Sequence, residues 1–217
     1  MVAIYEKLRP TSLDEFVGFP LQVEQLTTLQ ETVGWGGQAF WITGGSGWGK
    51  STLARIIAKT VAEEFEIEEI DAQELSLDTI REWERRCAYY PRKEAHALIV
   101  NESHMIGTKS VSRLQTFLEH EHVQRNATVI FTTTDKGQDR LFDTRFDAFP
   151  FLSRCIMVEL TLDTYTVEAM RGYLMGVADK LKLNGSTEAQ YDNLLVECQG
   201  NMRKALQAIA SGKMKAA

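Results

Sequence analysis

The sequence has no uninterrupted run of about 18 apolar residues, the length that a helix needs to cross a bilayer. It therefore predicts no membrane-spanning segment and no membrane partner. The first ten residues include Glu6, Lys7 and Arg9 and have no apolar stretch, so they do not resemble a signal peptide. From these absences we expect a cytoplasmic protein.

Cysteine is scarce. The three cysteines, Cys87, Cys155 and Cys198, are far apart, odd in number and never arranged as C-x-x-C. This pattern argues against a disulfide framework and against a cysteine zinc site. We expect three reduced, partly buried thiols.

The chain also lacks an excess of basic charge. Its 217 residues include 24 lysines and arginines against 30 acidic side chains, which gives a net charge of −6. A protein that binds DNA alone usually carries a basic excess that replaces the counterions of the phosphates. Any contact with DNA should therefore be local or shared with partner subunits.

Five short runs with β-strand character, most of them apolar, alternate with segments of helical spacing. The runs ALIV and TVIF have no apolar–polar alternation, which is typical of central parallel strands covered on both faces. The order predicts an α/β fold with a five-stranded parallel sheet between helices. The expected strands span residues 39–43, 66–72, 97–101, 128–133 and 156–160, and the expected helices of this region span 51–65, 77–88 and 109–120.

The character of the chain changes after the last expected strand. Residues 163–182, 187–198 and 201–210 predict three helices with no β run between them, and Gly185 and Gly200 stand at the expected helix ends. We therefore expect two domains, a core over residues 1–162 and a small helical lid over residues 163–217.

A phosphate-binding loop follows the first expected strand. The segment GGSGWGKS matches G-x-x-x-x-G-K-[ST] between a strand and a helix, as in P-loop NTPases. Its backbone N–H groups would surround phosphate oxygens, Lys50 would reach the β and γ phosphates, and Ser51 would hold Mg²⁺. The expected nucleotide-binding residues here are Gly44, Gly45, Ser46, Gly47, Trp48, Gly49, Lys50, Ser51 and Thr52.

A second phosphate-site motif ends the third expected strand, in the run LIVNESH. Glu102 is the candidate base that polarises the attacking water. Asn101 stands where an aspartate usually assists Mg²⁺. It would contact the water around the ion through a neutral amide oxygen. We therefore expect weaker metal binding and slow hydrolysis. Thr134, after the next strand, is placed to bond the γ-phosphate or that water.

Two arginines are candidates for the charge that develops on a transferred phosphoryl group. Arg154 lies in LSRC before the last strand, and Arg203 lies in GNMR at the start of the last helix. A guanidinium can act on its own site or on that of a neighbouring subunit. On the residues alone, each arginine is more often a surface or ion-paired residue.

With these motifs assembled, residues 5–212 resemble the AAA+ ATPases, and among them the clamp-loader subunits of the bacterial gamma/tau type. The similarity includes KLRPTSLDEFVGF, NESHMIGTKSVSRLQTFLEH, IFTTTD, LSRC and GNMRKAL. The resemblance implies ATP with Mg²⁺ as the ligands and adenine contacts near Val17 and Gly18. It further implies that Thr134 acts as sensor 1, Arg203 as sensor 2 and Arg154 as an arginine finger in trans.

The implied function is a clamp-loader-like ATPase of DNA replication. Its partners would be other AAA+ subunits assembled head to tail, a sliding clamp and primer-template DNA. Lys109 and Arg113, in the helix after Glu102, are the DNA-contact candidates, although ordinary solvated charges explain them equally well. Departures from the family pattern are Asn101, Leu8 in place of a tyrosine, the missing cysteine zinc module and the missing collar domain.

Two alternatives stay open. The chain could be a nucleotide-dependent scaffold subunit that hydrolyses ATP weakly or not at all, which Asn101 favours. It could also be an AAA+ loader of a helicase. Glu102, Thr134, Arg154 and Arg203 together favour an enzyme.

Overall fold

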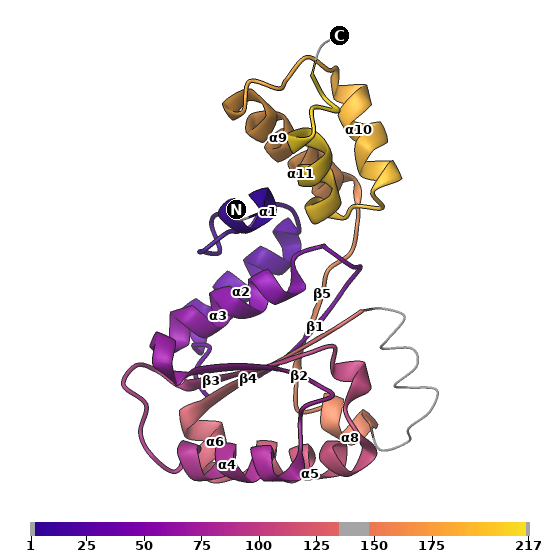
Figure 1. Cartoon of the computed structure of the whole chain (residues 1–217). Coiled ribbons are helices and arrows are strands. Elements are labelled where there is room, and N and C mark those ends of the chain that lie inside the picture. The colour runs from indigo at the N-terminus through magenta and orange to yellow at the C-terminus, as the bar shows by residue number, and fades with distance from the viewer. Residues whose placement is uncertain (1–2, 135–147, 216–217) are drawn as a thin grey trace.

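The structure, a computed structural model, describes residues 3–134 and 148–215 and is built on a parallel sheet of five strands (Figure 1). The strand order across the sheet is β2-β3-β4-β1-β5, and every pairing is parallel. All five predicted strands are confirmed. Their bounds are β1 Ala39–Thr43, β2 Ile67–Asp71, β3 His96–Asn101, β4 Ala127–Thr133 and β5 Ile156–Glu159.

Helices cover both faces of this sheet. The sandwich confirms the predicted α/β P-loop NTPase fold. One face carries α2 and α3, and the other carries α4, α5, α6 and α8. The bounds are α1 Ile4–Lys7, α2 Pro20–Thr32, α3 Lys50–Val61, α4 Leu77–Cys87, α5 Thr108–Glu119, α6 Glu121–Asn126 and α8 Ala148–Leu152, with 3₁₀ turns at Glu64–Glu66 and Ser103–Met105.

The central strands are apolar throughout because their alternate side chains enter two different cores. In β1, Phe40 and Ile42 pack on the α3 side, whereas Trp41 packs on the α5 side. In β3, Ile99 and Leu98 divide in the same way. Burial on both faces removes the polar positions that mark a strand with one solvated face.

The helix predicted over residues 51–65 is wrong at its end. Helix α3 stops at Val61, because Ala62 is extended and Glu63 begins a 3₁₀ turn. Glu63 and Glu66 form a capping box there, with each side chain accepting from the backbone of the other. This local bonding competes with continuation of the helix.

Helix α2 is absent from the sequence-based prediction. It buries only Leu26 fully, so it carries no apolar stripe that periodicity could reveal. Its polar side chains bond the open side of β5: Gln22 Nε2 donates to the carbonyl oxygen of Glu159 at 2.8 Å, and Gln25 Nε2 donates to that of Met157 at 3.4 Å.

The last three helices are α9 Thr164–Lys180, α10 Glu188–Glu197 and α11 Met202–Ala210, within one or two residues of their predicted bounds. Asp163 and Asn201 cap α9 and α11 by accepting from backbone N–H groups. Helix α11 packs against α1, near the N-terminus (Figure 1). Among the described residues, no helix is long and apolar enough to cross a membrane.

Candidate nucleotide site

The phosphate loop connects the end of β1 at Thr43 to the start of α3 at Lys50. Gly44, Gly47 and Gly49 have φ values of 147°, 78° and 102°, which residues other than glycine rarely adopt. A Cβ on Gly49 would also lie 2.8 Å from the ring of Phe16. The loop leads directly into the N-terminus of α3, whose unpaired N–H groups and dipole attract anions.

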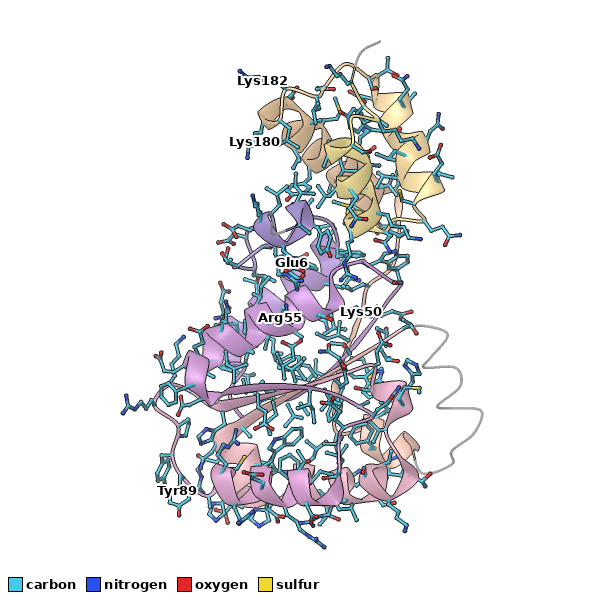
Figure 2. The ribbon with its side chains drawn as sticks, in the orientation of Figure 1. Glu6, Lys50, Arg55, Tyr89, Lys180 and Lys182 are labelled. Carbon is cyan, nitrogen blue, oxygen red and sulfur yellow. The ribbon has the colours of Figure 1, made fainter. Side chains whose placement is uncertain are left out.

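Lys50 is buried in this loop. Its Nζ donates to the carbonyl oxygens of Gly44 at 2.8 Å and Gly45 at 2.9 Å. In Figure 2 Lys50 lies on α3, between the sheet and the C-terminal helices. A cationic amine held this closely inside a glycine loop is suited to bind phosphate oxygens, which would replace the carbonyl partners.

The side chains that could hold Mg²⁺, here called the cation side of the site, belong to a continuous hydrogen-bonded network. Ser51 Oγ donates to Asn101 Oδ1 at 3.2 Å, and Thr132 Oγ1 donates to the same oxygen at 2.9 Å. Asn101 Nδ2 donates to Glu69 Oε1 at 2.7 Å, and Arg55 donates to both oxygens of Glu69 at 2.7 and 3.0 Å. Hydroxyl and amide oxygens are ligands that Mg²⁺ accepts directly or through water, so the residues fit this ion.

Sequence reasoning missed three residues of this network, Glu69, Arg55 and Thr132. Glu69 pairs with Ile99 in the parallel register, so its side chain lies on the same face as that of Asn101. Burial raises the pKa of Glu69, but hydrogen bonds from Arg55 and Asn101 outweigh burial and leave the pKa lowered. Hydrogen bonding to Glu69 also raises the pKa of Arg55. Both groups are therefore charged at neutral pH.

Glu102 follows β3 and is exposed, with a left-handed φ of 51°. Such a backbone costs about 1–3 kcal/mol and is common at functional sites. Glu102 Oε2 lies 3.5 Å from His104 Nδ1, which is itself 3.1 Å from Thr133 Oγ1. Glu102 and Thr134 line one pocket together with Lys50, so the structure brings these three predicted residues together.

Part of the lining of this pocket is apolar and suits a nucleobase. Val17 lines it as predicted, whereas Gly18 faces α9, with Met170 Cε and Thr166 Cγ2 each 3.5 Å from where its Cβ would be. Sequence reasoning missed most of this wall, because its residues are scattered along the chain. They are Tyr5, Leu8, Pro10, Phe16, Tyr173 and Leu206, with Arg9 beside them.

The phosphate loop also contacts the turn between α10 and α11. Trp48 Nε1 donates to the carbonyl oxygen of Gln199 at 3.0 Å, and the backbone N–H of Met202 donates to the carbonyl oxygen of Gly47 at 3.2 Å. Arg203 lines the pocket, and its guanidinium lies 5.3 Å from the centre of the Tyr5 ring. Of the other predicted loop residues, Ser46 and Thr52 line the pocket as well.

Sequence comparison identifies the family. The family described as ABC transporter matches residues 33–147, which is more than half of the chain and contains the phosphate loop and Glu102. The chain belongs to this family of P-loop NTPases. A search of curated protein sequences found no match.

Solved structures share the fold of this P-loop NTPase. The T158V variant of RuvB from Thermotoga maritima is 22% identical with a TM-score of 0.67, over 94% of this chain and 64% of that one. The replication initiator DnaA, bound to AMPPCP and single-stranded DNA, is 17% identical with a TM-score of 0.66, over 96% of this chain and 66% of that one. The chain thus spans just under two thirds of these relatives.

Arg154 lies away from the pocket of this P-loop NTPase. It precedes β5, whose first residue Ile156 pairs with Phe40 near the amino end of β1, whereas the phosphate loop follows the carboxyl end. At about 3.3 Å per residue, β1 alone separates the two ends by about 13 Å. Arg154 is ion-paired with Glu119 at the end of α5 and bonds the carbonyl oxygen of Pro150.

The two DNA-contact candidates occupy different environments on α5. Lys109 is exposed in the first turn of α5. Arg113 is ion-paired with Glu84 of α4, and Glu84 also approaches His120 at 3.6 Å. Neither candidate lines the nucleotide pocket.

Proposed function

We propose that this P-loop NTPase binds ATP with Mg²⁺ between a core over residues 1–162 and a lid over residues 163–217, and that it hydrolyses ATP. The observation that carries the proposal is the pocket itself. The phosphate loop, an apolar wall, Glu102 and Arg203 all line it.

The residues divide the chemistry among themselves. Lys50 and the N-terminus of α3 would bind the β and γ phosphates, while Ser51 and Asn101 would hold Mg²⁺, which neutralises charge on the phosphate oxygens when bound. Glu102 would accept a proton from the attacking water. Thr134 would orient that water or the γ-phosphate.

The two arginines would respond to the γ-phosphate from different subunits. Arg203, on the lid, would couple the lid position to the nucleotide. Arg154 would complete the site of an adjacent subunit, because the sheet separates it from its own site. Head-to-tail contacts of this kind are heterologous and build rings or spirals.

We further propose a DNA-replication role in the cytoplasm as a clamp-loader-like subunit that acts with a sliding clamp on primer-template DNA. The motif resemblance supports this role, and so does the likeness in fold to DnaA, whose structure contains single-stranded DNA. Lys109 is exposed and could follow the phosphate backbone, whereas Arg113 would first have to leave Glu84.

A second candidate is a nucleotide-dependent scaffold subunit that binds ATP, gives Arg154 to a neighbour and hardly turns over. The observation that favours it is Asn101, a neutral amide at the place of an acidic residue. A helicase loader is a further alternative, for which the SRC triplet is less expected.

One set of measurements separates these functions. We expect titration with ATP to show Mg²⁺-dependent binding, sizing with a non-hydrolysable ATP analogue to show assembly, and phosphate release to accelerate in the assembled state. Binding and assembly without phosphate release would indicate the scaffold. A chain that binds no ATP would refute both functions, and pull-down with a sliding clamp against a helicase would identify the client.

A further inference from the structure

The Asn101 amide must face in one direction for the cation side of the site to work. Its oxygen points to Ser51 Oγ and Thr132 Oγ1 at 3.2 and 2.9 Å, and its NH₂ group points to Glu69 at 2.7 Å. If the amide were reversed, an NH₂ group would face Ser51, where a cation needs an oxygen.

The two hydroxyls cannot fix this direction. A hydroxyl both donates and accepts, so Ser51 and Thr132 could bond either end of the amide. An ionised carboxylate only accepts, so Glu69 can bond the NH₂ end and not the oxygen. Glu69 is therefore the group in the network that decides which end of Asn101 faces Ser51.

Arg55 holds Glu69 in position. It donates to both carboxylate oxygens, a two-point contact that fixes the plane of the carboxylate as well as its distance. In Figure 2 Arg55 lies on the same helix as Lys50. The chain of contacts thus runs from α3 through β2 to the end of β3 and back to the phosphate loop.

We propose that Glu69, held by Arg55, is a positioning residue that orients Asn101 so that its oxygen serves the cation site. This inference rests on the proposed ATP and Mg²⁺ binding. It also explains why position 101 is an asparagine. An aspartate there would lie within hydrogen-bond distance of the Glu69 carboxylate, and one of the two carboxyl groups would have to stay protonated or move. Asn101→Asp alone therefore does not restore an ordinary site.

The test measures the affinity of the full chain for a non-hydrolysable ATP analogue with Mg²⁺ and with EDTA. The ratio of the two affinities reports the cation site and not the fold. For Glu69→Ala we expect binding in EDTA to be unchanged and the Mg²⁺ enhancement to fall about tenfold, as for other groups that orient metal ligands.

Glu68→Ala is the matched control. Glu68 is the neighbouring residue of β2, is exposed to a similar degree and is ion-paired with Arg86 at 2.7 Å, but it faces the opposite side of the sheet. Its removal should leave the Mg²⁺ enhancement as in the wild type. If Glu69→Ala and Glu68→Ala give the same ratio, the proposal is overturned.

A double variant keeps the test valid even if Glu69→Ala folds poorly. Glu69→Gln with Asn101→Asp reverses the hydrogen bond, because the amide introduced on β2 can donate to the new carboxylate and accept from Arg55. We expect Asn101→Asp alone to lower the Mg²⁺ enhancement and the double variant to recover or exceed it. Equal enhancement in the single and double variants would overturn the proposal, whereas a wild-type chain that binds no ATP would refute the proposed function itself.

Discussion

The edge of the sheet at the carboxyl ends of its strands (the carboxyl edge) and the edge at their amino ends (the amino edge) hold their polar side chains in different ways. At the carboxyl edge, Lys50 is buried and Asn101 is fully engaged by neighbours from three elements. At the amino edge, Arg154 is partly exposed and held by the side chain of Glu119. The groups at the carboxyl edge are already arranged around a ligand site, whereas Arg154 could turn outward if it gave up a surface ion pair with Glu119 and a hydrogen bond to the carbonyl oxygen of Pro150.

This contrast fits the proposed reaction, in which phosphate binding and water activation occur at the carboxyl edge and Arg154 acts on another subunit. Phosphate binding and water activation need groups that are already fixed, since fixed dipoles need no rearrangement during the reaction. A side chain that acts on another subunit, as proposed for Arg154, needs an ion pair within its own chain that is weak enough to break. The four variants below break or sharpen this contrast, from the largest expected effect to the smallest.

Arg154→Ala tests the amino edge. We expect turnover of the assembled protein to fall about 1,000-fold, because an arginine finger supplies that much stabilisation, while ATP affinity stays unchanged. Phosphate release with and without assembly measures this. Arg125→Ala, which removes an exposed arginine paired with Glu121, is the control and should change neither quantity. An equal loss of ATP affinity with Arg154→Ala would contradict a role in trans.

Glu102→Gln tests water activation at the carboxyl edge. The amide cannot take a proton, so phosphate release should fall about 100-fold or more, with ATP affinity retained. Single-turnover phosphate release together with equilibrium ATP titration separates the two. Unchanged turnover would remove Glu102 from the proposed mechanism.

Lys50→Ala tests phosphate binding at the same edge. Loss of the buried amine removes charge-assisted bonds to two phosphates, and we expect ATP affinity to fall about 100-fold. Lys59→Ala, in the last turn of the same helix, is the control and should bind ATP normally. ATP affinity within about twofold of the wild type would show that the nucleotide binds elsewhere.

Trp48→Phe tests the contact between the loop and the lid. The ring remains but the bond to the Gln199 carbonyl is lost, so the free energy of unfolding should fall by about 1 kcal/mol and ATP affinity by no more than about fivefold. Trp35→Phe loses a comparable bond to Leu26 at 3.0 Å, far from the loop. It should lower stability by more, because Trp35 is fully buried and the smaller ring leaves a cavity, and it should leave ATP affinity unchanged.

The sequence allowed prediction of the strands and of the phosphate loop for different reasons. Strands such as β3 and β4 are short apolar runs bounded by polar or turn residues, and both faces of each are buried. The loop is a contiguous motif in which Gly49, Lys50 and Ser51 are adjacent. Both signals are local, so no knowledge of distant contacts is needed.

What could not be predicted depends on contacts between distant segments. Glu69 and Asn101 meet only through the register of two parallel strands, which composition does not specify. The apolar wall of the pocket joins Tyr5 with Tyr173 and Leu206 from the far end of the chain. Helix α2 buries too little to show a periodic pattern.

The glutamines of α2 have a consequence for how copies of the chain can associate. An open strand edge invites a strand from another molecule to pair with it, which leads to fibres and uncontrolled aggregation. Gln22 and Gln25 already donate to carbonyls of β5, and at the other edge β2 carries Glu68, Glu69 and Asp71. A strand added beside β5 would have to displace these glutamine contacts, and one added beside β2 would meet the charge of its acidic side chains.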